Sequence, residues 1–347
     1  MTTKAYAIRE FGGPDRFEET EIDLPGLKPT DVRLSVRAAS VNPIDYKLRR
    51  GDFGGLFPLV LGHDMSGVVE EVGSAVSRLT PGDEIWAYLG GPCSNGSYAE
   101  EVVVPEAFVA PKPSNLSWAE AAAFPVVGLT SLESLRDRAR IAADDTVFVA
   151  GGAGGLGSIS IQLLRQEGVE SIVTTAGSDA SFRFLREELG LAAKRIVDYR
   201  DRSAEEVAFE AMERNGDASF SVALDYVGGP MKEACFKVID FGGRIVSVVE
   251  EPPDFAVPIW NGRQSPLFAK SASLHFELLG ARGLFGGPRA WDGYFHDLIT
   301  LAADFESKKL RPLGIADVQP MTVAAITAFH ERLESGGASG KLVLEIH

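Results

Sequence analysis

Between residues 144 and 249, short apolar segments alternate with single helical segments, and this pattern limits the fold more than any other feature of the chain. The apolar segments are DDTVFVA, SIVTTAG, RIVDY, FSVALDYVGG and GRIVSVV. The segments that separate them, 155–168, 179–190, 203–216 and 230–242, have the composition of helices. Strands that alternate with single helices require a parallel sheet that is covered on both faces. We therefore expect an α/β domain with a doubly wound parallel sheet.

The first third of the chain is organised differently, as short strands without helices between them. In DVRLSVRAAS, apolar residues alternate with polar ones, which is the period of a half-buried strand. SGVVEEVG, GDEIWAYL and SYAEEVVVP are further short strands between Gly, Pro and Ser, as in an irregular β barrel. The final GKLVLEI also alternates and is expected to return to this β domain. The expected β domain spans residues 1–125 and 283–347, and the α/β domain spans residues 126–282. The segment 118–138 is helical in composition, with Ser117 as its expected N-cap.

Charge and composition argue against several partners and compartments. The chain has 347 residues and a net charge of −15, so nucleic acid and anionic membranes would be repelled. Its two cysteines, Cys93 and Cys235, cannot build a disulfide framework or a cysteine-rich metal cluster, which suits a reducing compartment. The N-terminal residues show no signal-peptide pattern, and no segment is long and apolar enough to span a membrane. We expect a cytoplasmic protein without membrane or nucleic-acid partners.

The segment TVFVAGGAGGLGSISIQLLRQ has the pattern Gly-x-Gly-x-x-Gly between an expected strand and an expected helix. Gly152 would allow the tight turn, Gly154 would let the backbone approach a pyrophosphate, and Gly157 would let helix and strand pack closely. The pyrophosphate would bind free amides at the helix N-terminus. The alternative is a glycine-rich turn that only reverses the chain. The context favours a dinucleotide-binding loop of six residues: Gly152, Ala153, Gly154, Gly155, Leu156 and Gly157.

The second strand of this region should end in an acid if the ribose 2′-hydroxyl of NAD(H) is to be bound. The residues at that place are AGS, and the following Asp179 is better placed to cap the next helix. Without a carboxylate, a 2′-phosphate is not repelled, and Ser178, Arg183 and Tyr199 could form its pocket. We therefore expect NADPH as the cofactor. The alternative for Arg183 is a solvated residue on a helix surface.

Further motifs extend these features over the whole chain: SVNPIDYKLRRGDF, PLVLGHDMSGVVEEVGSAV, PGDEIWA, NGSYAEEVVVP, GGAGGLG, ALDYVGG and SGKLVLEI. With them the chain resembles the medium-chain dehydrogenase/reductase superfamily. Within it, the chain is most similar to the zinc-independent branch of quinone oxidoreductases (zeta-crystallin-like) and alkenal or enone reductases. The resemblance implies a GroES-like β domain, completed by the C-terminus, and an inserted Rossmann domain.

The resemblance also implies further cofactor contacts. Thr130 matches the position from which relatives contact the nicotinamide end, and Lys341 lies in the terminal motif. Val227 and Gly228, at the end of the fourth strand of the α/β region, are expected at the cofactor because ligands bind beyond the carboxyl ends of such strands. The alternative for Thr130 is a hydrogen bond back to its own helix.

The run PLVLGHDMSG raises the question whether His63 binds a metal. By the same resemblance, zinc-dependent relatives hold the catalytic metal with this histidine, a cysteine in the segment that matches VNPID, and a cysteine or acid before the inserted domain. Here the two other places fall at Asn42 and about Val127. Because catalytic zinc needs three protein ligands, we expect no metal. We interpret His63 as a remnant of that geometry, beside an Asp64 that hydrogen-bonds nearby loops.

Without a metal, alcohol oxidation is difficult, because it needs a Lewis acid or a strong base. Hydride donation from NADPH to a quinone or an α,β-unsaturated carbonyl is easier, because the conjugated carbonyl accepts the charge. The protein must then orient the acceptor, exclude water and offer donors to the forming oxyanion. The candidate catalytic residues are Asn42, Tyr46 and Lys47. In the resemblance, lysine at position 47 is typical of the alkenal and enone reductases and tyrosine is typical of the quinone reductases.

Each of these residues has a second interpretation. Lys47 could be a surface lysine or a partner of Asp45, Tyr46 could be a packing residue, and Asn42 could fix its loop or touch the nicotinamide ribose. Two loops supply possible walls of an apolar pocket, or else core or dimer contacts: Phe255, Trp260, Leu284 and Phe285. The remaining histidines form no cluster by spacing and are expected to be structural: His275, His296, His330 and His347.

The leading hypothesis is an NADPH-dependent reductase of quinones or activated alkenes that acts on a small apolar carbonyl or quinone. The alternatives are a zinc-type alcohol dehydrogenase, and a cofactor-binding redox sensor or structural protein with little activity. The resemblance further suggests a homodimer, in which the edge strand expected in SLHFELLGA pairs across a two-fold axis.

Overall fold

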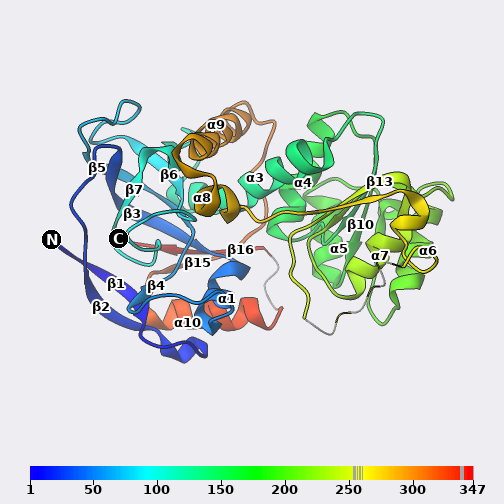
Figure 1. The fold of residues 1–347 in the computed structure, drawn as a ribbon, viewed down its shortest axis with the longest axis horizontal. Helices are drawn as coiled ribbons and strands as arrows, with labels where there is room; N and C mark the ends of the chain where they lie inside the picture. Colours follow the sequence, from blue (N-terminus) through cyan, green and yellow to red (C-terminus); the bar gives the residue numbers. More distant parts are fainter. Residues whose placement is uncertain (253–254, 256, 258, 260, 337–339, 347) are drawn as a thin grey trace. The chain divides into compact units, whose positions relative to one another are not determined.

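The computed structural model describes all residues except 253–254, 256, 258, 260, 337–339 and 347, so Trp260 and His347 lie outside the described residues. The chain forms two units, which we describe separately (Figure 1). Unit 1 comprises Met1–Leu129 and Leu279–His347, and unit 2 comprises Thr130–Leu278. The first division therefore falls within the segment Pro125–Leu132, and the second falls just before Gly280.

The described residues of unit 1 form two sheets, and the larger one is built around the strand expected in DVRLSVRAAS. In the larger sheet the order is β15-β16-β3-β5-β6-β8, and β7 also pairs with β3. Its strands are β3 (Asp31–Val41), β5 (Asp64–Val72), β6 (Glu84–Tyr88), β7 (Glu101–Pro105), β8 (Val109–Pro111), β15 (Ile315–Pro320) and β16 (Lys341–Glu345). The smaller sheet has the order β2-β1-β4, with β1 (Thr2–Ile8), β2 (Glu18–Asp23) and β4 (Leu59–Val60).

The C-terminal strand returns to the N-terminal β domain, as the sequence predicts. β16 pairs antiparallel with β3, with Val343 opposite Ser40, and Figure 1 shows this red strand within the blue and cyan unit. The helices of unit 1 are α1 (Pro43–Arg50), α2 (Trp118–Ala122), most of α3 (Pro125–Leu132), α8 (Gly280–Phe285), α9 (Gly287–Glu306) and α10 (Val323–Glu334). Two 3-10 turns, η1 (Pro14–Arg16) and η2 (Glu106–Phe108), complete the unit.

Unit 2 is the doubly wound domain that the alternating pattern predicts. Its strands lie in the order β11-β10-β9-β12-β13-β14, and each neighbouring pair is parallel. The strands are β9 (Thr146–Ala150), β10 (Ser171–Ala176), β11 (Ile196–Asp198), β12 (Phe220–Asp225), β13 (Ile239–Ser247) and β14 (Ser273–Phe276). The helices are α4 (Gly155–Gln166), α5 (Asp179–Glu187), α6 (Ala204–Arg214) and α7 (Pro230–Val238), with short turns η4 (Ala193–Arg195) and η5 (Phe268–Lys270). The strand order reverses between β9 and β12, where such sheets bind their ligands.

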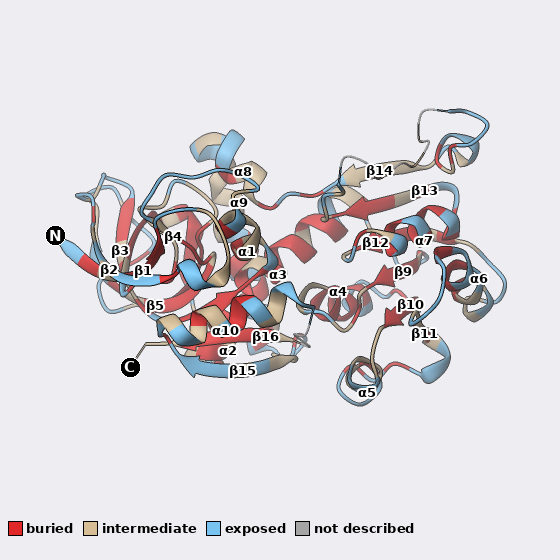
Figure 2. Ribbon diagram, turned by 90° about the horizontal axis from the view of Figure 1, so that it is seen from below, coloured by how far each residue is buried: buried red, intermediate tan, exposed pale blue. Residues whose placement is uncertain are grey.

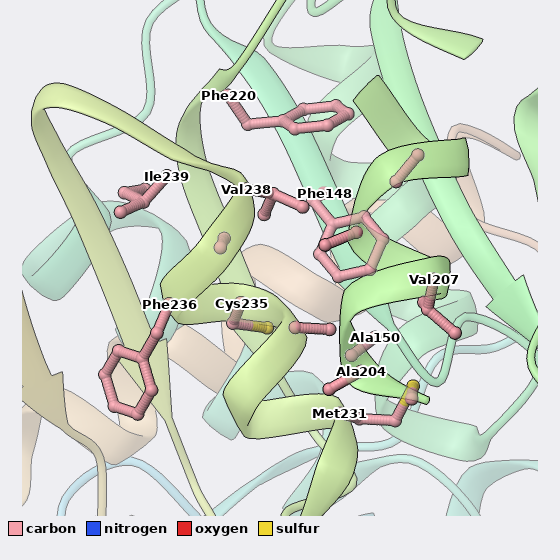
Figure 3. Close-up of a cluster of buried hydrophobic side chains, with 14 of the residues drawn as sticks. Phe148, Ala150, Ala204, Val207, Phe220, Met231, Cys235, Phe236, Val238 and Ile239 are labelled. Carbon is pink, nitrogen blue, oxygen red and sulfur yellow. The ribbon is translucent and has the colours of Figure 1, made fainter. Parts of the chain in front are cut away.

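The core of unit 2 lies between the sheet and the helices α6 and α7. Figure 3 shows Phe148 of β9 and Phe220 of β12 beside Val207 of α6 and Cys235 of α7, all within one apolar cluster. Because side chains alternate along a strand, Val147 points to the opposite face, and it is also fully buried. Both faces of the sheet are therefore covered, and Figure 2 shows β9 and β10 as buried strands.

One local prediction is confirmed in outline and one is wrong. The segment 118–138 is helical, but it is divided into α2, α3 and a π-helix, η3 (Glu133–Ala139), and α3 begins at Pro125, which lacks the N–H that a continuous helix needs. Ser117 does cap α2, since its hydroxyl accepts a hydrogen bond from the Glu120 N–H. Asp179 is the first residue of α5 and not its cap, because Ser178 takes that role by accepting from the N–H of Ser181.

One edge of the larger sheet in unit 1 is β15, and one edge of the sheet in unit 2 is β14. Figure 2 shows β15 as mostly exposed and β14 as intermediate. β14 lies in the segment SLHFELLGA that the sequence identifies as an edge, and it pairs with β13 only on one side within the described residues. Phe276, at its end, is 70% exposed. In the described part of the chain, no helix has the length and apolar character needed to cross a membrane.

Candidate functional site

The glycine-rich loop of unit 2 connects β9 to the N-terminus of α4 at the point where the strand order reverses. The left-handed residue of the turn is Gly151, with φ of +87°, and not Gly152. Gly152 is needed for a different reason, because a Cβ there would lie 2.1 Å from Oγ1 of Thr174 on the neighbouring strand β10. The expectation that Gly152 makes the tight turn is therefore wrong.

The two other glycines of the pattern have the expected geometry. A Cβ on Gly157 would lie 2.3 Å from the carbonyl oxygen of Gly151, so only glycine lets α4 pack this closely on the loop. A Cβ on Gly154 would meet only that same oxygen, at 3.4 Å, so the backbone at Gly154 is open to a ligand. Gly154 is also the N-cap of α4 and offers no side chain to the first amides of the helix. These amides, at Gly155 and its neighbours Leu156 and Gly157, fit the pyrophosphate of a dinucleotide.

The loop after β12 lies beside the glycine-rich loop, since a Cβ on Gly151 would approach the Val227 side chain to 2.7 Å. From the sequence, Val227 and Gly228 are expected at the end of the fourth strand. β12 ends at Asp225, however, so these two residues belong to the turn that follows it. Their N–H groups both donate to the buried Asp225 carboxylate, at 3.3 Å and 2.8 Å. Val227 is nevertheless 42% exposed, so its side chain remains available at the carboxyl end of the sheet.

A hollow of about 390 Å³ lies at the carboxyl ends of β10 and β11. It is lined by Asp179, Phe182, Arg183, Arg186, Glu187, Asp198 and Arg200. Arg183, which the sequence indicated, therefore lies near Arg200, which sequence reasoning missed. Arg200 bonds Asp198 at 2.6 Å and Asp179 at 2.9 Å, and its guanidinium holds the pKa of Asp198 below the usual range.

The two other residues expected at a 2′-phosphate lie close to this hollow. The Tyr199 hydroxyl covers Gly177, where a Cβ would lie only 2.1 Å away, so an acidic side chain has no room at this position. Ser178 follows Gly177 directly, and its hydroxyl is bonded to the hydroxyl and the N–H of Ser181. The structure thus brings the positions of Ser178, Arg183 and Tyr199 to one end of the sheet.

A larger hollow of about 1280 Å³ also lies in unit 2, and several of its polar groups bond one another. It includes Ser171, the first residue of β10, and is therefore at the opposite end of that strand from the glycine-rich loop. Arg195 donates to Ser171, Ser171 donates to Asn215, and Arg214 pairs with Glu210. We assign no chemistry to this hollow.

In unit 1, Asp64 is the centre of a buried polar cluster. Its carboxylate accepts hydrogen bonds from Ser40 Oγ and Asn42 Nδ2, each at 2.7 Å, and from the Val126 N–H at 2.6 Å. Lys341 Nζ lies 3.2 Å from the carboxylate and 2.6 Å from Oδ1 of Asn42. Asp64 is fully buried, whereas Asn42 and Lys341 are 2% and 5% exposed. The interpretation of Asp64 as a residue that hydrogen-bonds nearby loops is confirmed.

This cluster gives Asn42 and Lys341 partners within unit 1. The side-chain amide of Asn42 donates a hydrogen bond from its nitrogen and accepts one at its oxygen. Both bonds favour the interpretation that Asn42 fixes its loop. The Lys341 ammonium is part of the same closed arrangement, and a cofactor contact from it stays a prediction. Val127 is 7% exposed, and its aliphatic side chain offers no metal ligand.

His63 is not an isolated remnant, because it pairs with Asp45, an acid that the sequence suggests only as a partner of Lys47. Its Nδ1 lies 2.7 Å from Oδ1 of Asp45, which is fully buried in α1. Asp45 also accepts from the N–H groups of Asn42, at 2.7 Å, and Gly62, at 3.2 Å. In the part of the chain that the structure describes, no group of three His, Cys, Asp or Glu residues could hold a metal ion.

The remaining predicted residues lie on helices. Tyr46 and Lys47 are half-buried on α1, and the Arg50 guanidinium lies 5.2 Å from the centre of the Tyr46 ring. Thr130 is 8% exposed in α3, next to Ser131, whose hydroxyl bonds Ser160 of α4 at 2.9 Å. Leu284 and Phe285 are 65% and 83% exposed on α8. Roles in catalysis or substrate binding for these residues stay predictions.

Two family models match the chain, one within unit 1 and one that begins in unit 2 and extends into the C-terminal part of unit 1. The alcohol dehydrogenase GroES-like domain matches residues 28–114, and the zinc-binding dehydrogenase model matches residues 191–344. The chain belongs to the medium-chain dehydrogenase/reductase superfamily. This assignment agrees with the GroES-like β domain and with the Rossmann-type sheet of unit 2.

The relatives identify the branch of this superfamily. The chain is 35% identical to the 2-methylene-furan-3-one reductase of Solanum lycopersicum over 263 residues, which cover 73% of this chain and 64% of the relative. Identity and coverage are the same for the chloroplastic NADPH-dependent alkenal/one oxidoreductase of Arabidopsis thaliana. The aligned part thus spans less than two thirds of these relatives. The quinone oxidoreductase structure from Coxiella burnetii covers the whole of both chains at 28% identity, with a TM-score of 0.78. The chain belongs to the branch of quinone oxidoreductases and alkenal/one reductases.

Proposed function

We propose that this protein is an NADPH-dependent reductase that donates a hydride to an α,β-unsaturated carbonyl or a quinone without a metal. The observation that carries the proposal is the closed cluster around Asp64. Where zinc chemistry would need a thiolate, Asn42 is bound to Asp64 and Lys341. An amide and an ammonium held in this way supply no ligand set for zinc, which takes thiolate, imidazole or carboxylate groups.

The cofactor proposal rests on the residues of unit 2. The open backbone at Gly154 and the uncapped start of α4 fit a pyrophosphate, and the site lies at the reversal of the strand order. The hollow beside Arg183 and Arg200, together with the Tyr199 ring over Gly177, favours a 2′-phosphate over a free ribose hydroxyl. When bound, the reduced nicotinamide supplies a hydride. The names of relatives include an NADPH-dependent alkenal/one oxidoreductase, which supports the same cofactor.

The residues of unit 1 would then serve the acceptor. A conjugated carbonyl that gains a hydride develops negative charge on its oxygen, and this charge needs hydrogen-bond donors in a site without bulk water. Tyr46 and Lys47 on α1 are the proposed donors, since both are half-buried on the helix that begins at the Asp64 cluster. Asn42 would hold the start of α1 in place. Enones are the preferred acceptor class, because both relatives described above are named as reductases of enone-type carbonyls.

The proposal is tested by following NADPH and NADH oxidation with matched enones, quinones and saturated ketones, with product identification. We expect turnover with NADPH and the conjugated acceptors, and products reduced at the carbon–carbon double bond of enones. Saturated ketones serve as the control and should remain unreduced. Tight NADPH binding without turnover of any acceptor would instead support a cofactor-binding sensor. Stoichiometric zinc, with alcohol oxidation that is lost on chelation, would support the alcohol dehydrogenase alternative.

We also propose a homodimer in which β14 pairs across a two-fold axis. The strand has an unpaired edge within the described residues, and two exposed apolar side chains, Phe276 and Leu278, lie at its end. Light scattering should give twice the mass of 37.2 kDa, and Phe276→Lys should shift the mass to that of one chain. A monomeric unmodified protein would contradict the proposal. Location in the cytoplasm stays a prediction.

A further inference from the structure

Asp45 and His63 form a carboxylate–imidazole pair that the proposed function leaves unused. The Nδ1–Oδ1 distance is 2.7 Å. The Asp45 side chain is fully buried, and the His63 side chain is 16% exposed. The pair therefore connects a protected carboxylate, on the same helix that carries Tyr46 and Lys47, to an imidazole that reaches solvent.

The surroundings of Asp45 keep its carboxylate ionised and fixed. Oδ2 accepts from the Asn42 N–H at 2.7 Å and lies 3.5 Å from the Tyr98 hydroxyl, while Oδ1 accepts from the Gly62 N–H at 3.2 Å. Burial alone would raise the pKa of Asp45. The hydrogen bond and charge of His63, together with the charge of His330 and the hydrogen bond from the Asn42 N–H, outweigh burial and hold the pKa below its usual value. An ionised carboxylate can only accept hydrogen bonds.

This arrangement determines the form of the imidazole. Because Asp45 is an acceptor, Nδ1 of His63 must carry a hydrogen, and the other ring nitrogen, Nε2, is left for exchange. Among the residues that the structure describes, Nε2 has no hydrogen-bond partner. Burial lowers the pKa of His63, but the bond to Asp45 and the charges of Asp45 and Asp64 raise it to a net value above 6.5. A carboxylate that orients an imidazole in this way is the arrangement that general acid–base catalysis uses.

We propose that His63 is the proton donor of the reductive reaction and that Asp45 is its positioning residue. This inference rests on the proposed function. Hydride addition breaks the π bond of the acceptor and leaves an enolate or a phenolate, which must gain one proton. That proton leaves Nε2 of protonated His63 and forms the new C–H or O–H bond. The imidazolium becomes a neutral imidazole, and water returns the proton to it.

The groups that face the pair come from several elements. Asp64 of β5 acts on His63 by its charge, and it is itself bonded to Lys341 of β16. The Tyr88 ring of β6 lies 6.5 Å from the imidazole, between ring centres. Beyond Asp45 lie Tyr98, whose hydroxyl is 3.2 Å from His330 Nε2 in α10, and Arg49 of α1, which is paired with Glu334.

The direction of the pH dependence follows from the charge of His63. Protonated His63 is the active form, so kcat is high at low pH and falls as the pH rises through its folded pKa, above 6.5. The carboxylates of Asp45 and Asp64 stabilise this protonated form, while burial opposes it.

The test compares the unmodified enzyme with His63→Asn and His63→Gln, using NADPH and an α-methyl enone. In His63→Asn the new side-chain amide can still donate to Asp45 from the place of Nδ1, but it has no Nε2 and does not titrate. We expect kcat for His63→Asn to fall about 100-fold, the order of general acid catalysis, with the KM for NADPH within about twofold. The decline of kcat at high pH should disappear in both variants. Protonation at the α-carbon should also lose its stereochemical preference, which a merely structural residue would not affect.

A second measurement needs neither substrate nor cofactor. Nitrogen-15 NMR of the labelled protein should show the Nδ1–H form of His63 and a pKa above 6.5, and Asp45→Asn should lower that pKa. Unchanged kcat and pH profile in a folded His63→Asn would overturn the inference while the proposed function stands. A titration of His63 below 6.5 would overturn it as well. Absence of turnover in the unmodified enzyme would contradict the proposed function and, with it, the proton-donor role.

Discussion

The buried pair of Lys341 and Asp64 gives the sharpest test of how unit 1 is held together. Lys341→Met removes an ammonium that bonds Asn42 Oδ1 at 2.6 Å and lies 3.2 Å from Asp64, and both ionic partners are at most 5% exposed. Loss of one partner of such a pair costs about 3–5 kcal/mol, because the other charge stays buried. Asp64 keeps three donors, from Ser40, Asn42 and Val126, so we expect about 3 kcal/mol.

For domains of about 150–250 residues this loss corresponds to a fall of roughly 6–12 °C in the thermal midpoint. Tryptophan fluorescence is a suitable probe, because Trp86, Trp118 and Trp291 all lie in unit 1. The second variant is the double substitution Lys341→Met with Asp64→Asn, in which neither buried charge remains and Asn42 Oδ1 can accept from the new amide. We expect it to be more stable than Lys341→Met by about 1–3 kcal/mol.

Lys4→Met is the matched control for this experiment. Lys4 pairs with Glu19 at 2.9 Å, but the two side chains are 38% and 56% exposed. Since exposed pairs contribute little, the midpoint should not change. If Lys341→Met melts like the unmodified protein, or if the double substitution costs as much as its two single ones together, the buried pair does not stabilise unit 1 and the reasoning is refuted.

The other predictions concern acid stability, the cofactor loop and cofactor choice. Burial lowers the pKa of His330 to about 4, so between pH 6.5 and 4 the unfolded chain binds a proton at this residue and the folded chain does not. The unmodified protein should therefore lose roughly 3 kcal/mol of stability as the pH falls through this range, and His330→Gln should not. Equal acid sensitivity of both proteins in urea unfolding would contradict this. Gly154→Ala should fold normally but bind NADPH more weakly, as measured by titration calorimetry. Gly157→Ala should instead lower the thermal midpoint, because its Cβ would lie 2.3 Å from a backbone oxygen. A loss of stability in Gly154→Ala with weaker binding only in Gly157→Ala would refute these roles. Arg183→Ala should raise the KM for NADPH about tenfold and leave the KM for NADH unchanged, since a charged hydrogen bond contributes about 1.5–3 kcal/mol. A parallel rise of both KM values would show that Arg183 does not bind the 2′-phosphate.

The parts of the fold that follow from local sequence were predictable. Alternating strands and helices determine the sheet of unit 2, because each amphipathic helix must cover a face of that sheet. The roles of Gly154 and Gly157 also follow, since their spacing repeats a known backbone geometry. The break at Pro125 was available in the sequence too, because proline cannot continue a helix from the residue before it.

The polar clusters of unit 1 could not be predicted in the same way. Asp45 and His63 are 18 residues apart, and Lys341 lies 277 residues from Asp64. No helical or strand spacing in the sequence relates the two members of either pair. Each pair forms only because the fold brings distant segments of the chain together. Arg200 was missed because it lies in a short loop whose direction depends on the end of β11. The one available signal was the capping pattern at Asn42 and Asp45, which places the Asp45 carboxylate at the start of α1.

We propose that this member of the superfamily reduces conjugated acceptors and needs no metal for that reaction. The most direct measurement is NADPH oxidation with an enone by protein whose zinc content has been determined, with the product analysed by mass spectrometry and NMR. We expect full activity at negligible zinc content, unchanged by a chelator, and a saturated carbonyl product. Activity that follows zinc content, or a product in which the carbonyl and not the double bond is reduced, would contradict it.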